Sequence, residues 1–132
     1  AAFIVAVEQK NIAHGFCNNP LDLIHTSNIS EHHDNPDFFI EEVIEELGGI
    51  RTEWEPEKKT TYKGFQTPSD IDLLAAPSGK MAQLKSIISA ELDRYYEKFQ
   101  NNDCSYIKKW PRQKNLHGWH VVLKQQIGRA HV

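Results

Sequence analysis

The sequence has little cysteine, no long apolar run and no excess of basic residues. Its two cysteines, Cys17 and Cys104, are far apart and lack a metal-ligand spacing, so we expect reduced thiols in a cytoplasmic protein. The longest apolar run, Phe3 to Val7, is far too short to span a bilayer, and no basic stretch of a signal peptide precedes it. A formal net charge of −3 argues against binding to nucleic acid. We therefore expect neither a membrane nor a nucleic acid as partner.

Two common catalytic and nucleotide-binding motifs are also missing. Gly64 and Gly79 are isolated, and neither belongs to a phosphate-binding loop of the form GxxxxGK[ST]. There is no GxSxG nucleophile elbow. The content of 39% hydrophobic and 25% charged residues is ordinary for a soluble globular chain, and 132 residues suit one domain. Composition and spacing alone predict an α+β domain and no particular function.

Two stretches have the spacing of amphipathic helices. In the first, Asn35 can cap, Pro36 suits the first turn, and Gly48-Gly49 can end the helix. In the second, apolar residues recur every three or four positions from Met81 to Phe99. We expect this second helix to pack on a sheet and to carry no chemistry.

Strands are predicted where apolar and polar residues alternate or where β-prone residues gather. The predicted strands are Ile50 to Trp54, Thr60 to Thr67 around Gly64, and Leu116 to Lys124. Ala1 to Phe16 reads as a weak helix or a strand, and Asn101 to Lys114 as a loop. The acidic pairs Glu41-Glu42 and Glu45-Glu46 are expected on or beside the solvated face of their helix.

Two histidine clusters are candidates for a metal site. Adjacent His32 and His33, between Glu31 and Asp34, could bind a transition metal with help from elsewhere, but a solvated loop before a helix is the simpler interpretation. His117 and His120 frame Gly118-Trp119, and three positions apart on a strand they point to opposite faces. For this pair a zinc site, a solvent-facing role and a place in a pocket all remain open.

Three stretches, read in order, resemble a known family. They are YKGFQTPSDIDLL (Tyr62 to Leu74), LKSIISAELDRYYEKFQNNDCSYIKKWP (Leu84 to Pro111) and NLHGWHVVLKQQ (Asn115 to Gln126). Together they resemble the 2-oxoglutarate/Fe(II) oxygenase domain at the C-terminus of some bacterial tetratricopeptide-repeat proteins. CNNPLDLI (Cys17 to Ile24) is similar to the junction that follows the repeats. The positions that carry the resemblance are structural, not catalytic: Gly64, Gln66, Thr67, Leu73, Leu74, Trp110, Gly118 and Trp119.

The resemblance implies a double-stranded β-helix, or jelly roll, with helices packed on one face. The family's Fe(II) is expected to be held by two histidines and one carboxylate, which leaves positions open for 2-oxoglutarate and O₂. The first ligands follow the Gly-Trp strand in a stretch resembling G-x-x-x-x-H-x-H-P-x-G-W-x-S-G. A full-length parent would hydroxylate a protein or a small molecule.

The sequence departs from this pattern after Gln126. His131 can be aligned with the first histidine of the motif, but no second histidine, Pro or Gly-Trp-x-Ser-Gly follows. Ile127 to Val132 resembles one reading frame of a widely used sequencing adapter, and the first residue, Ala1, is not Met. We therefore expect a metagenomic fragment with a non-native tail, in which His131 is no ligand.

These expectations define a domain organisation. Residues 1–30 would be a linker after upstream repeats, 31–126 an incomplete oxygenase-like domain, and 127–132 the non-native tail. The fold class would be α+β, the N-terminal part of a jelly roll with an incomplete barrel. We expect no catalytic residue, no metal ligand and no bound cofactor in this chain, and self-association through the unpaired edge of the Trp119 strand. The alternative is a complete, non-catalytic α+β protein-interaction domain with little exposed apolar surface.

Overall fold

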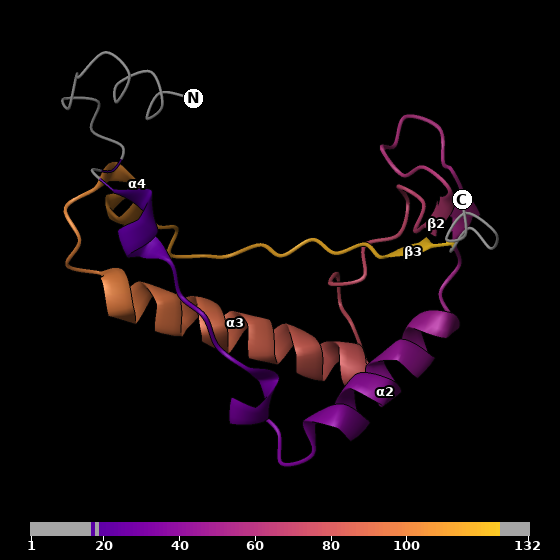
Figure 1. Cartoon of the computed structure of the whole chain (residues 1–132), viewed down its shortest axis with the longest axis horizontal. Helices are drawn as coiled ribbons and strands as arrows, with labels where there is room; N and C mark the ends of the chain where they lie inside the picture. The colour runs from indigo at the N-terminus through magenta and orange to yellow at the C-terminus, as the bar shows by residue number, and fades with distance from the viewer. Residues whose placement is uncertain (1–16, 18, 125–132) are drawn as a thin grey trace, which may run out of the picture. The chain divides into compact units, whose positions relative to one another are not determined.

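The described part of the chain is an α+β structure with three helices and one small, open, antiparallel sheet (Figure 1). The computed structural model describes residues 17 and 19–124, so the predicted element at Ala1 to Phe16 and the tail at 127–132 lie outside it. In chain order the elements are η1 (Pro20–Leu23), η2 (Ile29–Glu31), α2 (Pro36–Gly48), β1 (Glu53–Trp54), β2 (Gly64–Gln66), α3 (Gly79–Phe99), α4 (Ser105–Lys108) and β3 (Val121–Leu123). No helix among the described residues is long and apolar enough to cross a membrane.

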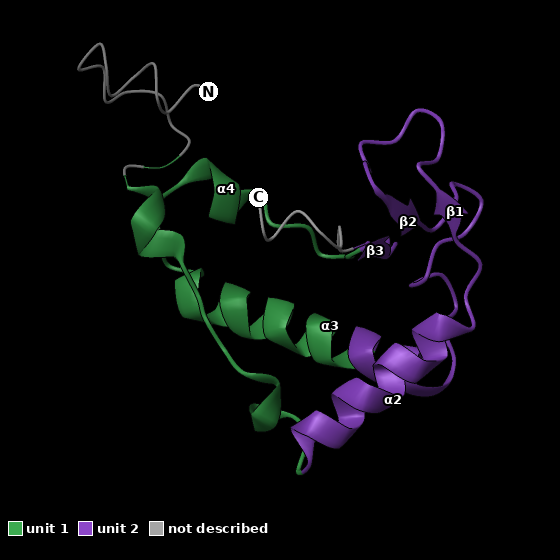
Figure 2. Cartoon of the chain, turned by 45° about the vertical axis from the view of Figure 1, so that its right-hand side comes forward, with its two compact units in different colours: residues 1–34, 86–114 green, residues 35–85, 115–132 purple. Residues whose placement is uncertain are grey.

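The chain divides into two compact units (Figure 2). Unit 1 comprises residues 1–34 and 86–114, and unit 2 comprises residues 35–85 and 115–132. Helix α3 begins in unit 2 and ends in unit 1, so each unit is built from stretches that are separate in the sequence.

Helix α2 forms where the capping signals place it. The Asn35 Oδ1 accepts a hydrogen bond from the Phe38 N–H at 3.2 Å, and Pro36 fills the first turn, where its missing N–H does no harm. The helix ends at Gly48, with Gly49 as its C-cap. Phe39 and Val43, one turn apart, are its buried residues, which confirms the predicted helix, whereas the apolar Ile40 and Ile44 beside them are exposed.

The start of α3 depends on a side chain of α2. The two carboxylate oxygens of Glu46 accept hydrogen bonds from the backbone N–H groups of Lys80, at 2.7 Å, and Met81, at 3.1 Å. Gly79 has a φ of +58°, and a Cβ there would lie 2.5 Å from Glu46 Oε1, so only glycine fits. Glu42 pairs with the Lys80 ammonium at 2.8 Å. The sequence predicted only solvated charges at Glu42 and Glu46, whereas both hold the first turn of α3.

The sheet has the order β1-β2-β3 and is shorter than predicted. Phe65 is opposite Trp54 on one side and Val122 on the other. Gly64 lies where β3 approaches closely, because a Cβ there would be 2.7 Å from the Val122 carbonyl oxygen. β1 stops at Trp54 because the next residue, Glu55, turns the backbone with a φ of 40°.

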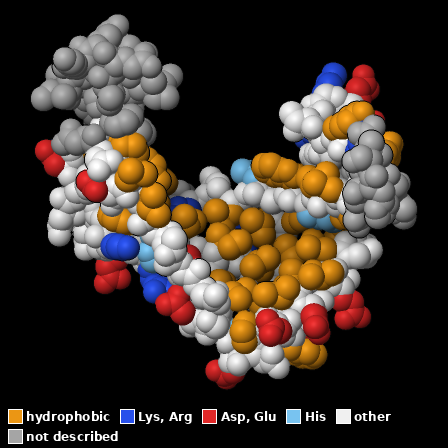
Figure 3. Space-filling model, in the orientation of Figure 1, with side chains coloured by type: hydrophobic (Ala, Val, Ile, Leu, Met, Phe, Trp, Pro, Cys, Tyr) orange, Lys and Arg blue, Asp and Glu red, His pale blue; other side chains and the backbone are white. Residues whose placement is uncertain are grey.

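The strand predicted at Leu116 to Lys124 is wrong in its extent. Only Val121–Leu123 joins the sheet, and all three residues are exposed. Trp119 is 63% exposed and Leu123 70%. β3 pairs with β2 alone among the described strands, so its second edge is open. Figure 3 shows hydrophobic side chains at the surface beside the strands.

Unit 1 has a small core of its own. Cys17, Cys104 and Ile107 are buried together, with Leu23, Tyr95 and Phe99 packed against them. Both thiols are free, and burial, together with the neighbouring Cys104, raises the pKa of Cys17. The C-terminal end of α3 therefore packs on this cluster, whereas the sequence predicted packing on a sheet. The loop predicted at residues 101–114 contains α4, which supplies Ile107.

Candidate functional site

Two of the stretches that carry the family resemblance interlock in unit 2. The Leu73 N–H donates to the Gly118 carbonyl at 2.8 Å, and the Thr67 N–H donates to the His120 carbonyl at 3.1 Å. The Thr67 hydroxyl accepts from the His120 N–H at 2.9 Å. Thr67 is only 1% exposed, so these bonds satisfy polar groups that water does not reach.

Asp72 is the centre of this junction. Its Oδ1 accepts hydrogen bonds from the backbone N–H groups of Leu74, at 3.0 Å, and Gly118, at 2.8 Å. Its Oδ2 lies 2.8 Å from Nδ1 of His117. These bonds favour the charged form and lower the pKa of Asp72 to about 2, with the Gly118 N–H as the largest cause. Asp72 thus ties the end of one stretch to the Gly-Trp element of the other.

Gly118 is required by close packing at the same point. A Cβ on Gly118 would lie 2.8 Å from Cγ of Leu74, closer than two carbon atoms can approach. Leu74 is itself buried. The contact explains why this position holds glycine in an otherwise extended stretch.

A small cavity of about 180 Å³ adjoins this junction. It is lined by Lys59, Thr67, Pro68, Ser69, Ile71, Asp72, His117, Gly118 and Trp119. Because Asp72 contacts Nδ1 of His117, Nε2 is the nitrogen left for a proton transfer or a ligand. The volume is below that of a typical organic-ligand pocket, so the cavity suits a small polar molecule at most.

The described residues do not fit an iron centre. Within residues 17 and 19–124, no group of three or more His, Cys, Asp or Glu side chains could hold a metal ion. His117 contacts Asp72, and His120 Nδ1 lies 3.1 Å from the Thr67 hydroxyl, so this pair does not converge on one point. Cys104 lies in the core of unit 1. His131 is outside the described residues.

The Glu31 to Asp34 stretch precedes α2 with Glu31 and Asp34 exposed, as predicted, but His32 within it is not solvated. His32 is part-buried, and its Nε2 contacts Oε1 of Glu91 on α3. Nε2 of His25 lies 3.0 Å from Oε2 of the same carboxylate. The two imidazoles therefore face opposite oxygens of one carboxylate, an arrangement of hydrogen bonds and not of metal ligands.

Glu91 joins three separate parts of unit 1. Besides the two histidines, it accepts a hydrogen bond from the Arg94 guanidinium at 2.7 Å, and Arg94 also contacts Glu31 at 3.5 Å. The bond from His32, followed by that from His25, lowers the pKa of Glu91 to about 2. No local pattern in the sequence around Glu91 indicates these distant partners.

Trp110 belongs to an aromatic cluster in unit 1. Its ring stacks on Tyr95 at 5.4 Å between centroids and on Tyr96 at 5.7 Å. Tyr106 lies nearly perpendicular to it, at 5.9 Å and 85°. The aromatic residues near Trp110-Pro111 were the available signal, but only a fold brings the rings into contact.

The predicted structural positions are therefore divided between the units. Unit 2 holds Gly64, Gln66, Thr67, Leu73, Leu74, Gly118 and Trp119, and unit 1 holds Trp110. Of the first group, Thr67, Leu74 and Gly118 meet in the junction around Asp72. Gln66 is buried and accepts a hydrogen bond from the Thr61 hydroxyl. The chain matches no protein-family model, no curated protein and no solved structure.

Proposed function

We propose that this chain carries the leading, non-catalytic part of a 2-oxoglutarate- and Fe(II)-dependent dioxygenase-like domain. Its small sheet would be the first part of a double-stranded β-helix, and the metal-binding strands would be separate from it. On this proposal the chain itself does not turn over 2-oxoglutarate. The substrate of the full-length hydroxylase, a protein or a small molecule, is recognised elsewhere.

The junction around Asp72 is the observation that carries the proposal. The two stretches that resemble the family, Tyr62 to Leu74 and Asn115 to Gln126, are bonded to each other through Thr67, Asp72 and Gly118. Residue types that looked arbitrary in the sequence have a steric or hydrogen-bonding reason there. This supports the view that these stretches form one structural unit leading into the Gly-Trp element.

The open sheet gives further support. A jelly roll buries its core between two sheets, so a leading portion alone leaves one face and one edge uncovered. Val122 and Leu123 are exposed at 48% and 70%, and Trp119 is 63% exposed. The alternative, a complete non-catalytic interaction domain, predicts little exposed apolar surface and is less consistent with these side chains.

No catalytic step is assigned to this chain, because its described residues do not fit the iron site. In the family, Fe(II) held by two histidines and a carboxylate would supply the oxygen chemistry when bound. Here the histidines of unit 2 are bonded to Asp72 and Thr67, and those at 25 and 32 to Glu91. What this part contributes is the scaffold that precedes the site.

The most direct test is to sequence the source locus beyond the codon of Gln126. The expected result is an open frame that continues into His-x-His-Pro and then Gly-Trp-x-Ser-Gly. A frame that continues without either motif would contradict the proposal. Because the test reads DNA, it does not depend on how stable the purified chain is.

Turnover by the purified chain gives an independent test. The chain is supplied with Fe(II), ascorbate and 2-oxoglutarate, and succinate is measured against a blank that contains the same iron without protein. We expect succinate no higher than in the blank. Succinate formation that rises in proportion to the chain would show a working iron site and overturn the proposal.

Self-association tests the open edge. Val122 lies in the middle of β3, and Val122→Lys places a charge on a strand whose second edge is open, which opposes edge-to-edge pairing. We expect sedimentation to show concentration-dependent association of the parent chain, reduced by this substitution. Gln83→Lys, on an exposed position of α3, adds the same charge away from the sheet and should leave association unchanged. A parent chain that stays monomeric at all concentrations would favour the interaction-domain alternative.

A further inference from the structure

Unit 1 contains a cavity of about 380 Å³, in a part of the molecule to which the proposed function assigns no role. One wall is aliphatic and comes from α3, with Ile87, Ile88 and Leu92. This volume lies in the range that holds a small organic molecule. The cavity is therefore a candidate ligand site independent of the oxygenase proposal.

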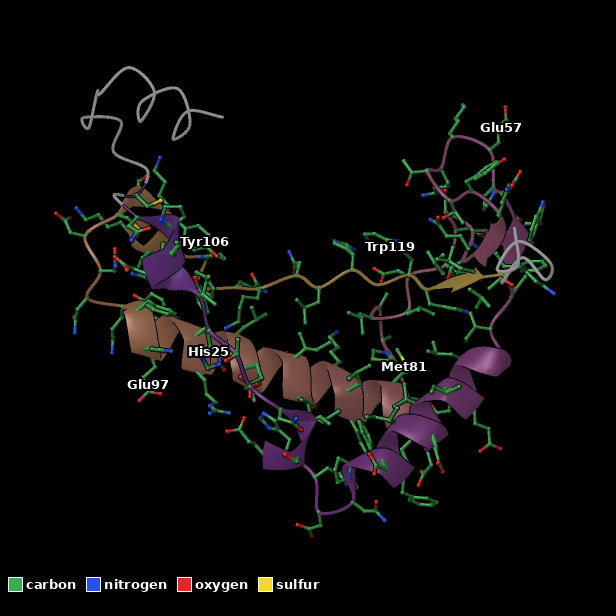
Figure 4. The ribbon with its side chains drawn as sticks, viewed as in Figure 1. His25, Glu57, Met81, Glu97, Tyr106 and Trp119 are labelled. Carbon is green, nitrogen blue, oxygen red and sulfur yellow. The ribbon has the colours of Figure 1, made fainter. Side chains whose placement is uncertain are left out.

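The second wall is aromatic and is fixed by its own contacts. Tyr95 and Trp110 are nearly parallel, at 18°, whereas Tyr106 is 76° from Tyr95 and 85° from Trp110. The rings thus form a corner with aromatic surface in two directions. The Tyr95 hydroxyl donates to the Leu23 carbonyl at 2.7 Å, which holds that ring in place. Figure 4 labels Tyr106 on α4 and His25 beside α3.

The polar wall carries negative charge. It consists of His25 and Glu91, and among the described residues that line the cavity none is Lys or Arg. Arg94 neutralises one carboxylate, but it contacts both Glu91 and Glu31. One guanidinium is therefore shared between two carboxylates.

We propose that the cavity of unit 1 binds a small organic cation with an apolar body, such as an arylalkylamine. The apolar body would contact Ile88 and Leu92, and the ammonium group would lie near Glu91 and the aromatic corner, since both attract a cation. An anionic ligand would bring a second negative charge to Glu91 with no basic side chain in the lining to offset it. The site therefore selects by charge as well as by shape.

A matched set of three probes tests the charge preference at pH 7. The probes are 2-phenylethylamine, 2-phenylethanol and 3-phenylpropionate, which share a phenyl group and differ in charge. Emission of Trp110 is recorded in a Trp54→Phe/Trp119→Phe variant, where it is the remaining indole and both replaced residues are exposed in the parent. We expect saturable binding of the amine, about tenfold weaker binding of the alcohol, and no saturation by the acid over the same range.

Two substitutions locate the binding. Ile88→Trp fills the cavity and should abolish binding of both the amine and the alcohol, which is measured for this variant by calorimetry because the new indole would add to the Trp110 emission. Glu91→Gln should reduce the preference for the amine to within about twofold. Glu97→Gln makes the same change on an exposed position near the end of α3 and should leave all affinities unchanged. Far-UV circular dichroism identifies a variant that has lost its helices.

Several results would overturn the proposal. Equal affinity of the parent for amine and alcohol would remove the charge argument, as would tight binding of 3-phenylpropionate. Binding that survives in a folded Ile88→Trp chain would place the ligand elsewhere. If Glu91→Gln fails to fold, the probe series on the parent and the result for Ile88→Trp are enough to accept or reject the proposal.

Discussion

Unit 1 and unit 2 are stabilised by different kinds of contact. In unit 1 the long-range bonds run mainly between side chains, with Glu91 as the common partner of two histidines and an arginine, and with rings stacked on Trp110. In unit 2 most of them involve the backbone, either as the partner of a side chain, as at Glu46, Thr67 and Asp72, or on both sides, as between Leu73 and Gly118. Side chains thus assemble unit 1, whereas in unit 2 they fix the path of the chain.

The two units also differ in how completely they bury their apolar residues. Unit 1 buries its cysteines and Ile107 in one cluster. Unit 2 buries Phe39 fully but leaves Ile44 62% exposed on the same helix. A unit fixed by backbone contacts can hold its shape while much of its apolar surface lies open.

The largest expected effect is on unit 2. Phe39 is 0% exposed, and Phe39→Ala should lower the free energy of unfolding by about 3–5 kcal/mol, through lost burial and the cavity that remains. Phe38→Ala, at the exposed neighbouring position, should cost about 0.5 kcal/mol. Urea unfolding, followed by emission of Trp119 with the other indoles replaced, measures both. Similar effects of the two substitutions would show that Phe39 is not the core of this unit.

The corresponding test in unit 1 uses Ile107, which is 2% exposed. Ile107→Ala should lower the free energy of unfolding by about 2–5 kcal/mol, measured from Trp110 emission during urea unfolding. Ile24→Ala, at a position 57% exposed, is the control and should cost about 0.5 kcal/mol. Ile107→Ala could lower the urea midpoint of the Trp119 signal as far as that of the Trp110 signal. The two units would then unfold as one, and the contrast between them would not extend to stability.

A pair of glycine substitutions tests the tight junction of unit 2 at a smaller scale. Gly118→Ala should destabilise by about 1–3 kcal/mol, because its Cβ would overlap Leu74. Gly48→Ala has no atom within 4 Å of the added carbon and should stabilise α2 by about 0.5–1 kcal/mol. The midpoint temperature of thermal unfolding should therefore fall for Gly118→Ala and rise for Gly48→Ala. A neutral Gly118→Ala would mean that the two stretches are not closely packed there.

The smallest expected effect is a pH dependence shared by the units. The pKa of Asp72 in unit 2 and that of Glu91 in unit 1 are both lowered to about 2. A lowered pKa stabilises the fold above the ordinary carboxyl range, and the contribution is lost as pH falls from about 4 toward 2. Asp72→Asn should flatten this acid dependence in the Trp119 signal alone, and Glu91→Gln in the Trp110 signal alone. Loss of the dependence in both signals from either substitution would contradict two separate acid-sensitive centres.

Helices α2 and α3 were predictable because their information is local, whereas the short α4 was predicted as a loop. Asn35, Pro36 and Gly49 act within one turn of the helix ends, and the periodic apolar residues of α3 mark its length. The strands were predictable in position but not in extent, because pairing depends on neighbours. Residues 116–120 alternate as a strand does, yet Gly118 bonds to Leu73 outside the sheet.

The candidate sites were harder to predict, because their partners are distant in the sequence. His25 and His32 meet Glu91 more than fifty positions away, and no local pattern indicates that meeting. Trp110 was noticed through the family resemblance, yet the stacking on Tyr95 and Tyr96 needs the fold. Charge and ring type were visible in the sequence, whereas proximity was not.

The contact between Glu46 and the first turn of α3 has a consequence for the order of folding. The acceptor for the Lys80 and Met81 N–H groups is 34 and 35 positions away, at the end of α2. A helix start that relies on a distant acceptor is unfavourable until that acceptor is in place, since the nucleus is the costly step of helix formation. The first turn of α3 should therefore form only after α2, and in hydrogen exchange its amides should open whenever α2 frays.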